Sequence, residues 1–172
     1  FPDAEGSPGR GLSLGREIWI EADDFAVEPP KGWKRLFPGG EVRLRHGYVL
    51  RCDEVVTDPA TGNVVELRCT HDRETLGRNP DRKIGGAIHW VSAHDGVAAE
   101  FRLYDRLFRA ADPDDVPEDG DFTDNLNPDS LRVARGYVEP AAVRGIPGVP
   151  GLDAPADAPW EARVQLERLG YF

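Results

Sequence analysis

Hydrophobic and polar residues alternate in short stretches along this chain, and no stretch keeps a helical period of 3.6 residues beyond two turns. Alternation places apolar side chains on one face of a strand and polar side chains on the other. The clearest case is residues 41–52, where Val42 and Leu44 alternate with Arg43 and Arg45. The pattern predicts an all-β chain of roughly eight short strands and no long helix.

The other predicted strands are separated by turns that contain many of the 19 glycines and 15 prolines. Residues 58–62 have the composition of a turn, which predicts a hairpin between the stretches on either side. Short strands with frequent turns favour β-barrels, because closure removes exposed sheet edges. A boundary between residues 1–82 and 83–172 divides the chain into two units of similar size. The remaining predicted strands are residues 16–21, 54–56, 64–69, 84–92, 98–108, 131–138 and 163–168.

The bulk composition indicates a globular protein of one large or two small domains, with 172 residues and 40% hydrophobic content. No apolar run reaches the roughly 20 residues that span a bilayer, and the polar start is unlike a signal peptide, so we expect a cytoplasmic protein without a membrane partner. Cys52 and Cys69 lack the spacing of a metal or redox motif, and we expect reduced core residues. Because no Met occupies position 1, we expect a piece of a longer polypeptide.

The chain contains no complete catalytic or metal-binding motif. His89 and His94 are five residues apart beside Asp95, but His89 falls in a predicted strand, where no metal-binding helix is available. Residues 105–129 hold nine acids and two basic residues, without the spacing of a calcium-binding loop, and predict a solvated loop. We therefore predict no catalytic residue, no metal and no bound cofactor in this chain.

The distribution of positive charge points to a binding surface. The formal net charge of −10 argues against nucleic-acid binding, yet residues 31–51 contain six of the 21 Lys and Arg residues and only one acid, Glu41. Arg43 and Arg45, two apart in a predicted strand, would project from one sheet face about 7 Å apart. That spacing resembles the spacing of adjacent phosphates or unstacked bases along a single RNA strand.

A possible aromatic contact lies beside this basic segment. Trp33 precedes Lys34 and Arg35, and its ring offers a surface on which a base can stack. An Arg guanidinium can form forked hydrogen bonds to a phosphate or a base edge, or stack on a base plane. The pattern alone leaves two interpretations equally open: an RNA contact, or the solvated face of a sheet.

Eight sequence blocks, in order and spread over almost the whole chain, closely resemble the C-terminal anticodon-binding region of bacterial glutaminyl-tRNA synthetases. The resemblance implies two β-barrels that hold the unstacked glutamine anticodon. The blocks are Glu17–Phe25, Trp33–Leu36, Glu41–Arg45, Ile88–Ser92, Arg102–Phe108, Asn127–Leu131, Gly136–Pro140 and Gln165–Phe172.

The resemblance also implies which residues touch the anticodon. Arg43 and Arg45 match the strand arginines that engage it, and Lys34 with Arg35 matches a Lys-Arg pair that meets it from a neighbouring loop. Gln165 and Arg168 match the pair that reads the middle base. This interpretation joins segments more than 100 residues apart into one site, which local patterns do not predict.

What the resemblance implies for the intact protein is an ATP-dependent glutamine-tRNA ligase. Its catalytic domain would lie upstream on the same polypeptide, ATP would bind there, and the present chain would be a non-catalytic, monomeric tRNA-binding part. Three alternatives stay open. They are the anticodon-binding region of an archaeal or eukaryotic-type glutamyl-tRNA synthetase, a free ribosomal-type RNA-binding β-barrel protein, and an acidic β scaffold that contacts only proteins.

Overall fold

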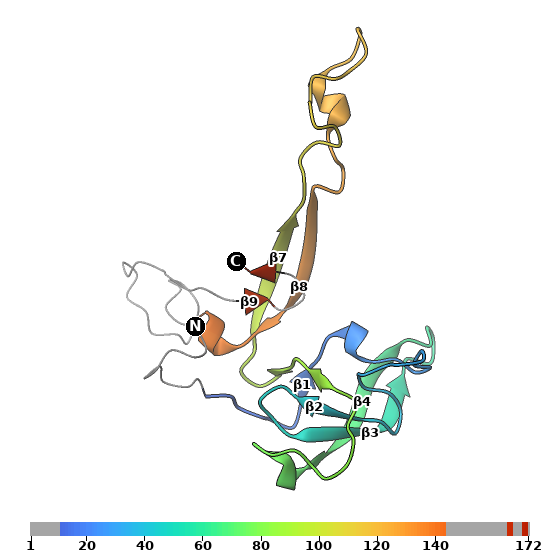
Figure 1. The fold of residues 1–172 in the computed structure, drawn as a ribbon, viewed down its shortest axis with the longest axis vertical. Coiled ribbons are helices and arrows are strands. Elements are labelled where there is room, and N and C mark those ends of the chain that lie inside the picture. The colour runs from blue at the N-terminus through green and yellow to red at the C-terminus, as the bar shows by residue number, and fades with distance from the viewer. Residues whose placement is uncertain (1–10, 144–164, 167–169, 172) are drawn as a thin grey trace, which may run out of the picture. The chain divides into compact units, whose positions relative to one another are not determined.

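The computed structural model describes residues 11–143, 165–166 and 170–171, and its elements in these ranges are strands and short 3-10 turns. The all-β prediction without long helices is confirmed for this part of the chain, whereas the two-barrel arrangement stays a prediction. In Figure 1 the colour follows the chain from blue at the N-terminus to red at the C-terminus. The strands are β1 Ile18–Trp19, β2 Glu41–Leu44, β3 Val49–Thr57, β4 Val64–Asp72, β5 Ala87–Ile88, β6 Val91–Ser92, β7 Val97–Tyr104, β8 Leu131–Val138, β9 Gln165–Leu166 and β10 Gly170–Tyr171. The 3-10 turns are η1 Ala22–Asp24, η2 Arg73–Thr75, η3 Phe122–Asn125 and η4 Pro140–Ala142.

The chain divides into two compact units, one formed by residues 12–94 and the other by the remaining residues. The first unit contains β1 to β6, and the second contains β7 to β10. The boundary that we predict at 82/83 stays a prediction. No helix in the described ranges is long and apolar enough to cross a membrane.

Most of the core residues of the first unit belong to a four-stranded sheet with the order β4-β3-β2-β5. Strands β2, β3 and β4 are antiparallel neighbours, and β5 pairs with β2 in parallel. Val42 and Leu44 of β2 have no exposed surface, as their alternation with polar residues predicts. The buried cluster consists of Leu36, Val42, Leu44, Leu50, Cys52 and Ile88.

The alternating stretch 41–52 is two strands, which corrects the prediction of one continuous pattern. Strand β2 ends at Leu44, and the chain turns through Arg45, His46 and Gly47 before β3 begins. His46 adopts a φ of 59°, and the Gly47 amide donates to the Leu44 carbonyl over 2.7 Å. Period-two patterning cannot reveal such a turn, because a tight antiparallel connection preserves the alternation on both sides.

The predicted hairpin around residues 58–62 is confirmed, with strands β3 and β4 longer than expected. The Asp58 carboxylate accepts hydrogen bonds from the Ala60 and Thr61 amides, and Gly62 takes a φ of 74°. Cys52 and Cys69 face each other across β3 and β4 as free thiols. Cys52 is a core residue as predicted, but Cys69 is exposed.

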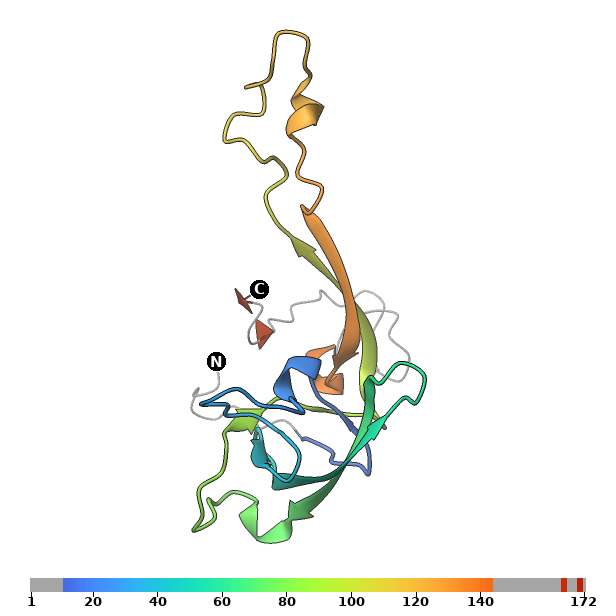
Figure 2. The same ribbon diagram turned by 90° about the vertical axis from the view of Figure 1, so that its right-hand side faces the viewer.

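The second unit contains a hairpin in which β7 and β8 pair in a continuous antiparallel register from Val97–Val138 to Tyr104–Leu131. The strand predicted at 131–138 coincides with β8. The acidic segment between the strands continues beyond them and contains η3 (Figure 2). A reciprocal capping box of Asp121 and Asp124 caps the N-terminal end of η3. The stretch 84–92, predicted as one strand, is instead the two short strands β5 and β6, which pair with different neighbours.

Candidate nucleic-acid interface

Arg35 is held in one orientation by its neighbours in the first unit. Its Nε lies 2.9 Å from Oδ1 of Asp24, a carboxylate with no exposed surface, and its Nη1 donates to the Asp23 carbonyl over 3.3 Å. Its guanidinium carbon sits 5.7 Å from the centre of the Trp33 ring, within the range of a cation–π contact. The Arg35 side chain is 37% exposed, so part of the fixed guanidinium faces solvent.

Local turns place Trp33 against Arg35. Gly32 takes a φ of 86°, which few other residues tolerate, and the Trp33 amide donates to the Pro30 carbonyl. The indole Nε1 of Trp33 then donates to the Leu36 carbonyl over 3.0 Å, which fixes the ring. Leu36 is itself anchored in the core, so the Trp–Arg stack rests on the packed part of the unit. Lys34, between the two stacked residues, is exposed.

The segment that leads into β5 joins the two halves of the basic region. A Cβ atom on Gly86 would collide with the Lys34 carbonyl oxygen, and one on Gly85 would lie 2.9 Å from the Glu41 carbonyl oxygen. Only glycine permits this close approach of three backbone segments. The Gly86 carbonyl in turn accepts a hydrogen bond from the Arg43 amide. The Lys34–Arg35 segment and β2 therefore both pack against the backbone of Gly85 and Gly86, just before β5.

The Arg43 side chain turns into the protein. Its Nη1 donates to the carbonyls of Gly47 and Thr75, at 2.9 and 2.8 Å. Its Nη2 donates to the Arg78 carbonyl at 2.6 Å and to Oδ1 of Asn79 at 3.3 Å. The guanidinium thus bridges the β2–β3 turn and residues 75–79, which run from the end of η2 into the following loop.

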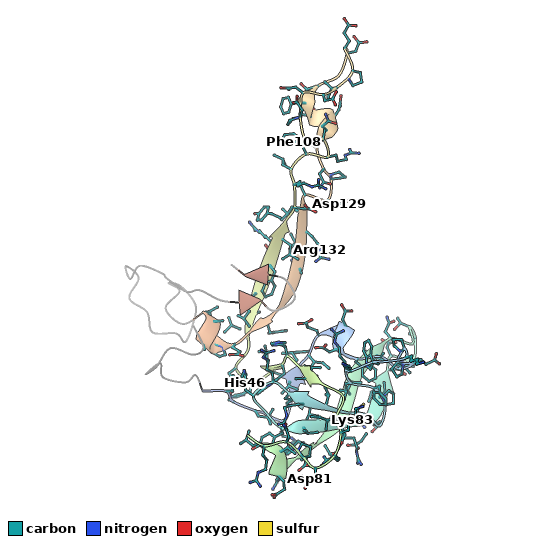
Figure 3. All side chains as sticks on the ribbon, viewed as in Figure 1. His46, Asp81, Lys83, Phe108, Asp129 and Arg132 are labelled. Atoms are coloured by element: carbon teal, nitrogen blue, oxygen red, sulfur yellow. The ribbon has the colours of Figure 1, made fainter. Side chains whose placement is uncertain are left out.

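Arg45 lies at the exposed turn and not in the strand, so Arg43 and Arg45 do not project in parallel from one strand as predicted. The backbone of Arg45 is fixed on both sides. Its amide donates to the Ile88 carbonyl, and its carbonyl accepts a hydrogen bond from Nε1 of Trp90 over 3.0 Å. These backbone hydrogen bonds hold the turn that presents Arg45 and His46. His46 is labelled in Figure 3.

A second arginine ties the loop after β4 to β2. Arg82 donates to both carboxylate oxygens of Glu41, at 2.8 and 2.9 Å, and to the Asp72 carboxylate at 2.8 Å. These hydrogen bonds from Arg82 are the main cause that lowers the pKa of Glu41 and of Asp72 below their ordinary values. Glu41, the single acid in the basic segment, is thereby neutralised by an internal partner, which leaves the segment positive.

Four of the six predicted contact residues, Lys34, Arg35, Arg43 and Arg45, lie in the first unit around β2 and β5. The backbone of Gln165 belongs to β9 in the second unit, paired with β10. Arg168 and the Gln165 side chain lie outside the described residues. Within those residues, no group of three or more His, Cys, Asp or Glu side chains is arranged to hold a metal ion.

The residues that organise the site were not among the predicted ones. Asp24 is the partner of Arg35, and Thr75, Arg78 and Asn79 are the partners of Arg43. The last three are 32 to 36 residues from Arg43 in the chain, and no local period links residues at such a separation. A sequence signal for this loop was the excess of basic over acidic residues at positions 73–83, a segment that was not part of the predicted site.

Comparison with known families matches this chain twice to one description, "tRNA synthetases class I (E and Q), anti-codon binding domain", over residues 1–72 and over residues 87–172. A glutamine–tRNA ligase of Neisseria meningitidis is 53% identical over 99% of this chain and 29% of its own length. Those of Ectopseudomonas mendocina and Pseudomonas aeruginosa are 52% identical over 95% of this chain and 27% of theirs. The chain thus spans less than a third of these relatives. By the two matches, the chain belongs to the family of anticodon-binding domains of class I tRNA synthetases for glutamate and glutamine.

Proposed function

We propose that this chain binds the anticodon loop of glutamine tRNA. The observation that carries the proposal is the cluster of Lys34, Arg35 and Arg45 on one packed unit of an anticodon-binding family member whose net charge is −10. A positive surface inside an acidic chain directs a polyanion to one place. The high identity to glutamine–tRNA ligases supports glutamine as the cognate amino acid.

The chemistry of the site suits splayed, single-stranded bases. Arg35 keeps N–H groups beyond the two used for Asp24 and Asp23, and a fixed guanidinium can read a base edge or a phosphate with little loss of side-chain entropy. Arg45 and Lys34 supply further positive charge from exposed positions. Trp33 holds Arg35 on its ring, so the pair offers a stacking surface for an unpaired base. Gln165 and Arg168 complete the proposed set from the second unit.

The proposal extends to the intact protein. We infer that the chain is the tRNA-binding part of a monomeric, cytoplasmic glutamine–tRNA ligase, whose separate catalytic domain binds ATP and attaches the amino acid. The share of the relatives that this chain covers supports such an arrangement, because more than two thirds of each relative lies outside the match. No catalytic role is proposed for any residue of this chain.

The direct test is binding to a synthetic anticodon stem-loop of glutamine tRNA, with a stem-loop of identical stem carrying a glutamate anticodon as control. We expect tighter binding of the glutamine stem-loop. The logarithm of its affinity should fall with that of the salt concentration, with a slope of about −0.7 per phosphate contact. Replacing Arg45 by Ala should weaken binding by roughly 5- to 150-fold if a base contact is lost. Equal affinity for the two stem-loops would remove glutamine specificity, and no measurable binding of either would contradict the proposal.

A further inference from the structure

The terminal nitrogens of Arg43 are fully used by hydrogen bonds to the protein itself, two of them partly buried and two exposed. Each of the two Nη atoms carries two N–H groups, and the four hydrogen bonds to Gly47, Thr75, Arg78 and Asn79 use all of them. The fifth donor, Nε, is buried and has no hydrogen-bond partner among the described residues. An RNA phosphate or base edge would therefore have to displace bonds that already exist.

The acceptors belong to two different segments. Gly47 is in the turn that presents Arg45, whereas Thr75 ends η2 and Arg78 and Asn79 follow it. Three of the four are backbone carbonyls, so Arg43 fixes the path of the chain and not merely the positions of side chains. Loss of these four hydrogen bonds would release the turn and the loop from each other.

Thr75 strengthens the same junction. Its Oγ1 accepts a hydrogen bond from the Val49 amide over 2.9 Å and donates to the Asp72 carbonyl over 2.6 Å. Thr75 is almost fully buried, at 1% exposure, so its bonds are shielded from water. Arg43 and Thr75 thus connect the start of β3, the β2–β3 turn and the η2 loop. In Figure 3, His46 marks the turn and Asp81 marks the chain beyond this loop.

We propose that Arg43 is a positioning residue that fixes the Arg45 turn against the loop of residues 75–79, and that it does not itself contact RNA. This assignment rests on the proposed function, and it removes Arg43 from the set of direct anticodon contacts. Arg45 then contacts the RNA, and Arg43 fixes the position of Arg45. The loop of residues 75–79 becomes part of the RNA-binding surface through its exposed Arg78.

The test compares Arg43→Ala, Arg43→Lys and Arg45→Ala for binding of the glutamine anticodon stem-loop over a series of salt concentrations. A lysine can replace one phosphate contact, but its compact ammonium cannot span four separate acceptors. We expect both Arg43 variants to lose about tenfold in affinity. The salt slope should stay close to that of the wild type for Arg43→Ala, because Arg45 keeps its charge near the RNA. It should become shallower by about 0.7 for Arg45→Ala if Arg45 contacts a phosphate in addition to a base.

The double variant Arg43→Ala/Arg45→Ala separates positioning from an independent contact. If Arg43 acts through Arg45, its loss costs little once Arg45 is absent, so the two effects should be far from additive. Arg68→Ala in β4 is the matched control, because it removes exposed ion pairs to Glu54 and Glu66 without touching the turn or the loop of residues 75–79. We expect it to leave the affinity within about twofold of the wild type, on the scale of an exposed ion pair.

Hydrogen exchange of the free protein tests, without RNA, whether Arg43 holds the turn against residues 75–79. In Arg43→Lys, the amides of Gly47 and Arg78, which close the turn and the loop, should exchange faster than in the wild type. Asn79→Ala is the milder variant if Arg43→Ala does not fold, since it removes one acceptor alone. Unchanged exchange, rescue of binding by Arg43→Lys, or additive effects in the double variant would each overturn the proposal. Failure of the wild-type chain to bind RNA, with faster exchange in Arg43→Lys, would instead contradict the proposed function.

Discussion

Acidic residues around the basic segment of the first unit have a different role from those in the segment that joins β7 to β8. Around the basic segment, carboxylates hold arginines: Asp24 pairs with Arg35, and Arg82 is bridged to Glu41 and Asp72. In the joining segment, carboxylates hold backbone, as shown by Asp105, Asp112 and Asp121, which accept from the amides of Arg106, Asp114 and Thr123. The comparison shows why net charge is a poor guide to binding, because acids can preorganise a basic site.

The largest expected effect is on Arg35, whose removal takes an ionic partner from the buried Asp24 carboxylate. Arg35→Ala should lower the free energy of unfolding by about 2–4 kcal/mol, somewhat less than for a fully buried pair because the Arg35 side chain is 37% exposed. Arg102→Ala is the matched control in β7: its Nε is also 2.9 Å from a carboxylate, that of Glu100, but both groups are exposed. The control should cost about 0–1 kcal/mol. Denaturant unfolding measures both, and equal losses would contradict the contrast between the two regions.

The next effect concerns close backbone approach. Gly86→Ala places a methyl group on the Lys34 carbonyl oxygen and should cost about 1–3 kcal/mol, as overpacking does. Gly136→Ala in β8 is the counterpart, because its added methyl would meet only a ring carbon of Phe101 at 3.4 Å. We expect Gly136→Ala to be nearly neutral in thermal unfolding. A tolerated Gly86→Ala would show that the Lys34–Arg35 segment is not held by this contact.

A smaller effect is expected in the dependence of stability on pH. The Arg82 hydrogen bonds lower the folded-state pKa values of Glu41 and Asp72, so their contribution is complete above the ordinary carboxyl range and is lost as the pH falls through the lowered values. The wild type should therefore lose stability on acidification below about pH 5 more steeply than Arg82→Gln does. Unfolding curves from pH 7 to pH 3 measure this, and identical slopes would contradict the ion-pair account.

The smallest effect is expected for the exposed acids between β7 and β8. Changing Asp114, Asp115 and Glu118 to their amides removes negative charge and leaves the carboxylates of Asp112 and Asp121, which hold the backbone, in place. The affinity for the glutamine stem-loop should stay within about twofold, whereas binding to unrelated duplex DNA at low salt should increase. Filter binding at two salt concentrations checks both outcomes. A large gain in stem-loop affinity would mean that the acidic segment opposes the basic site directly.

Part of this architecture follows from the sequence. The alternation of Val42 and Leu44 with charged residues predicted their burial, and the turn residues at 58–62 predicted the β3–β4 hairpin. The β2–β3 turn was missed because its left-handed residue is His46, whereas glycine or asparagine is the commoner signal. The break between β5 and β6 was missed for another reason, since no glycine or proline marks it at His89 and Trp90.

The site was predictable in its charge but not in its organisation. The basic cluster and the family resemblance pointed to Lys34, Arg35 and Arg45, which the structure places on one unit. The inward orientation of Arg43 was hidden, because its partners lie 32 to 36 residues further along the chain. A period-two pattern assigns an arginine to the polar face of a strand, but it does not tell whether solvent or another loop covers that face.

Mapping the RNA contact on the ¹⁵N-labelled chain is the most direct measurement of the central claim. Backbone amide shifts would be recorded while the glutamine anticodon stem-loop is added. The account predicts that, among residues 11–143, the largest shifts fall on residues 33–47 and 75–79, with no shifts in the acidic segment 105–130. Shifts centred on residues 105–130, or none within 33–47 at saturation, would contradict it.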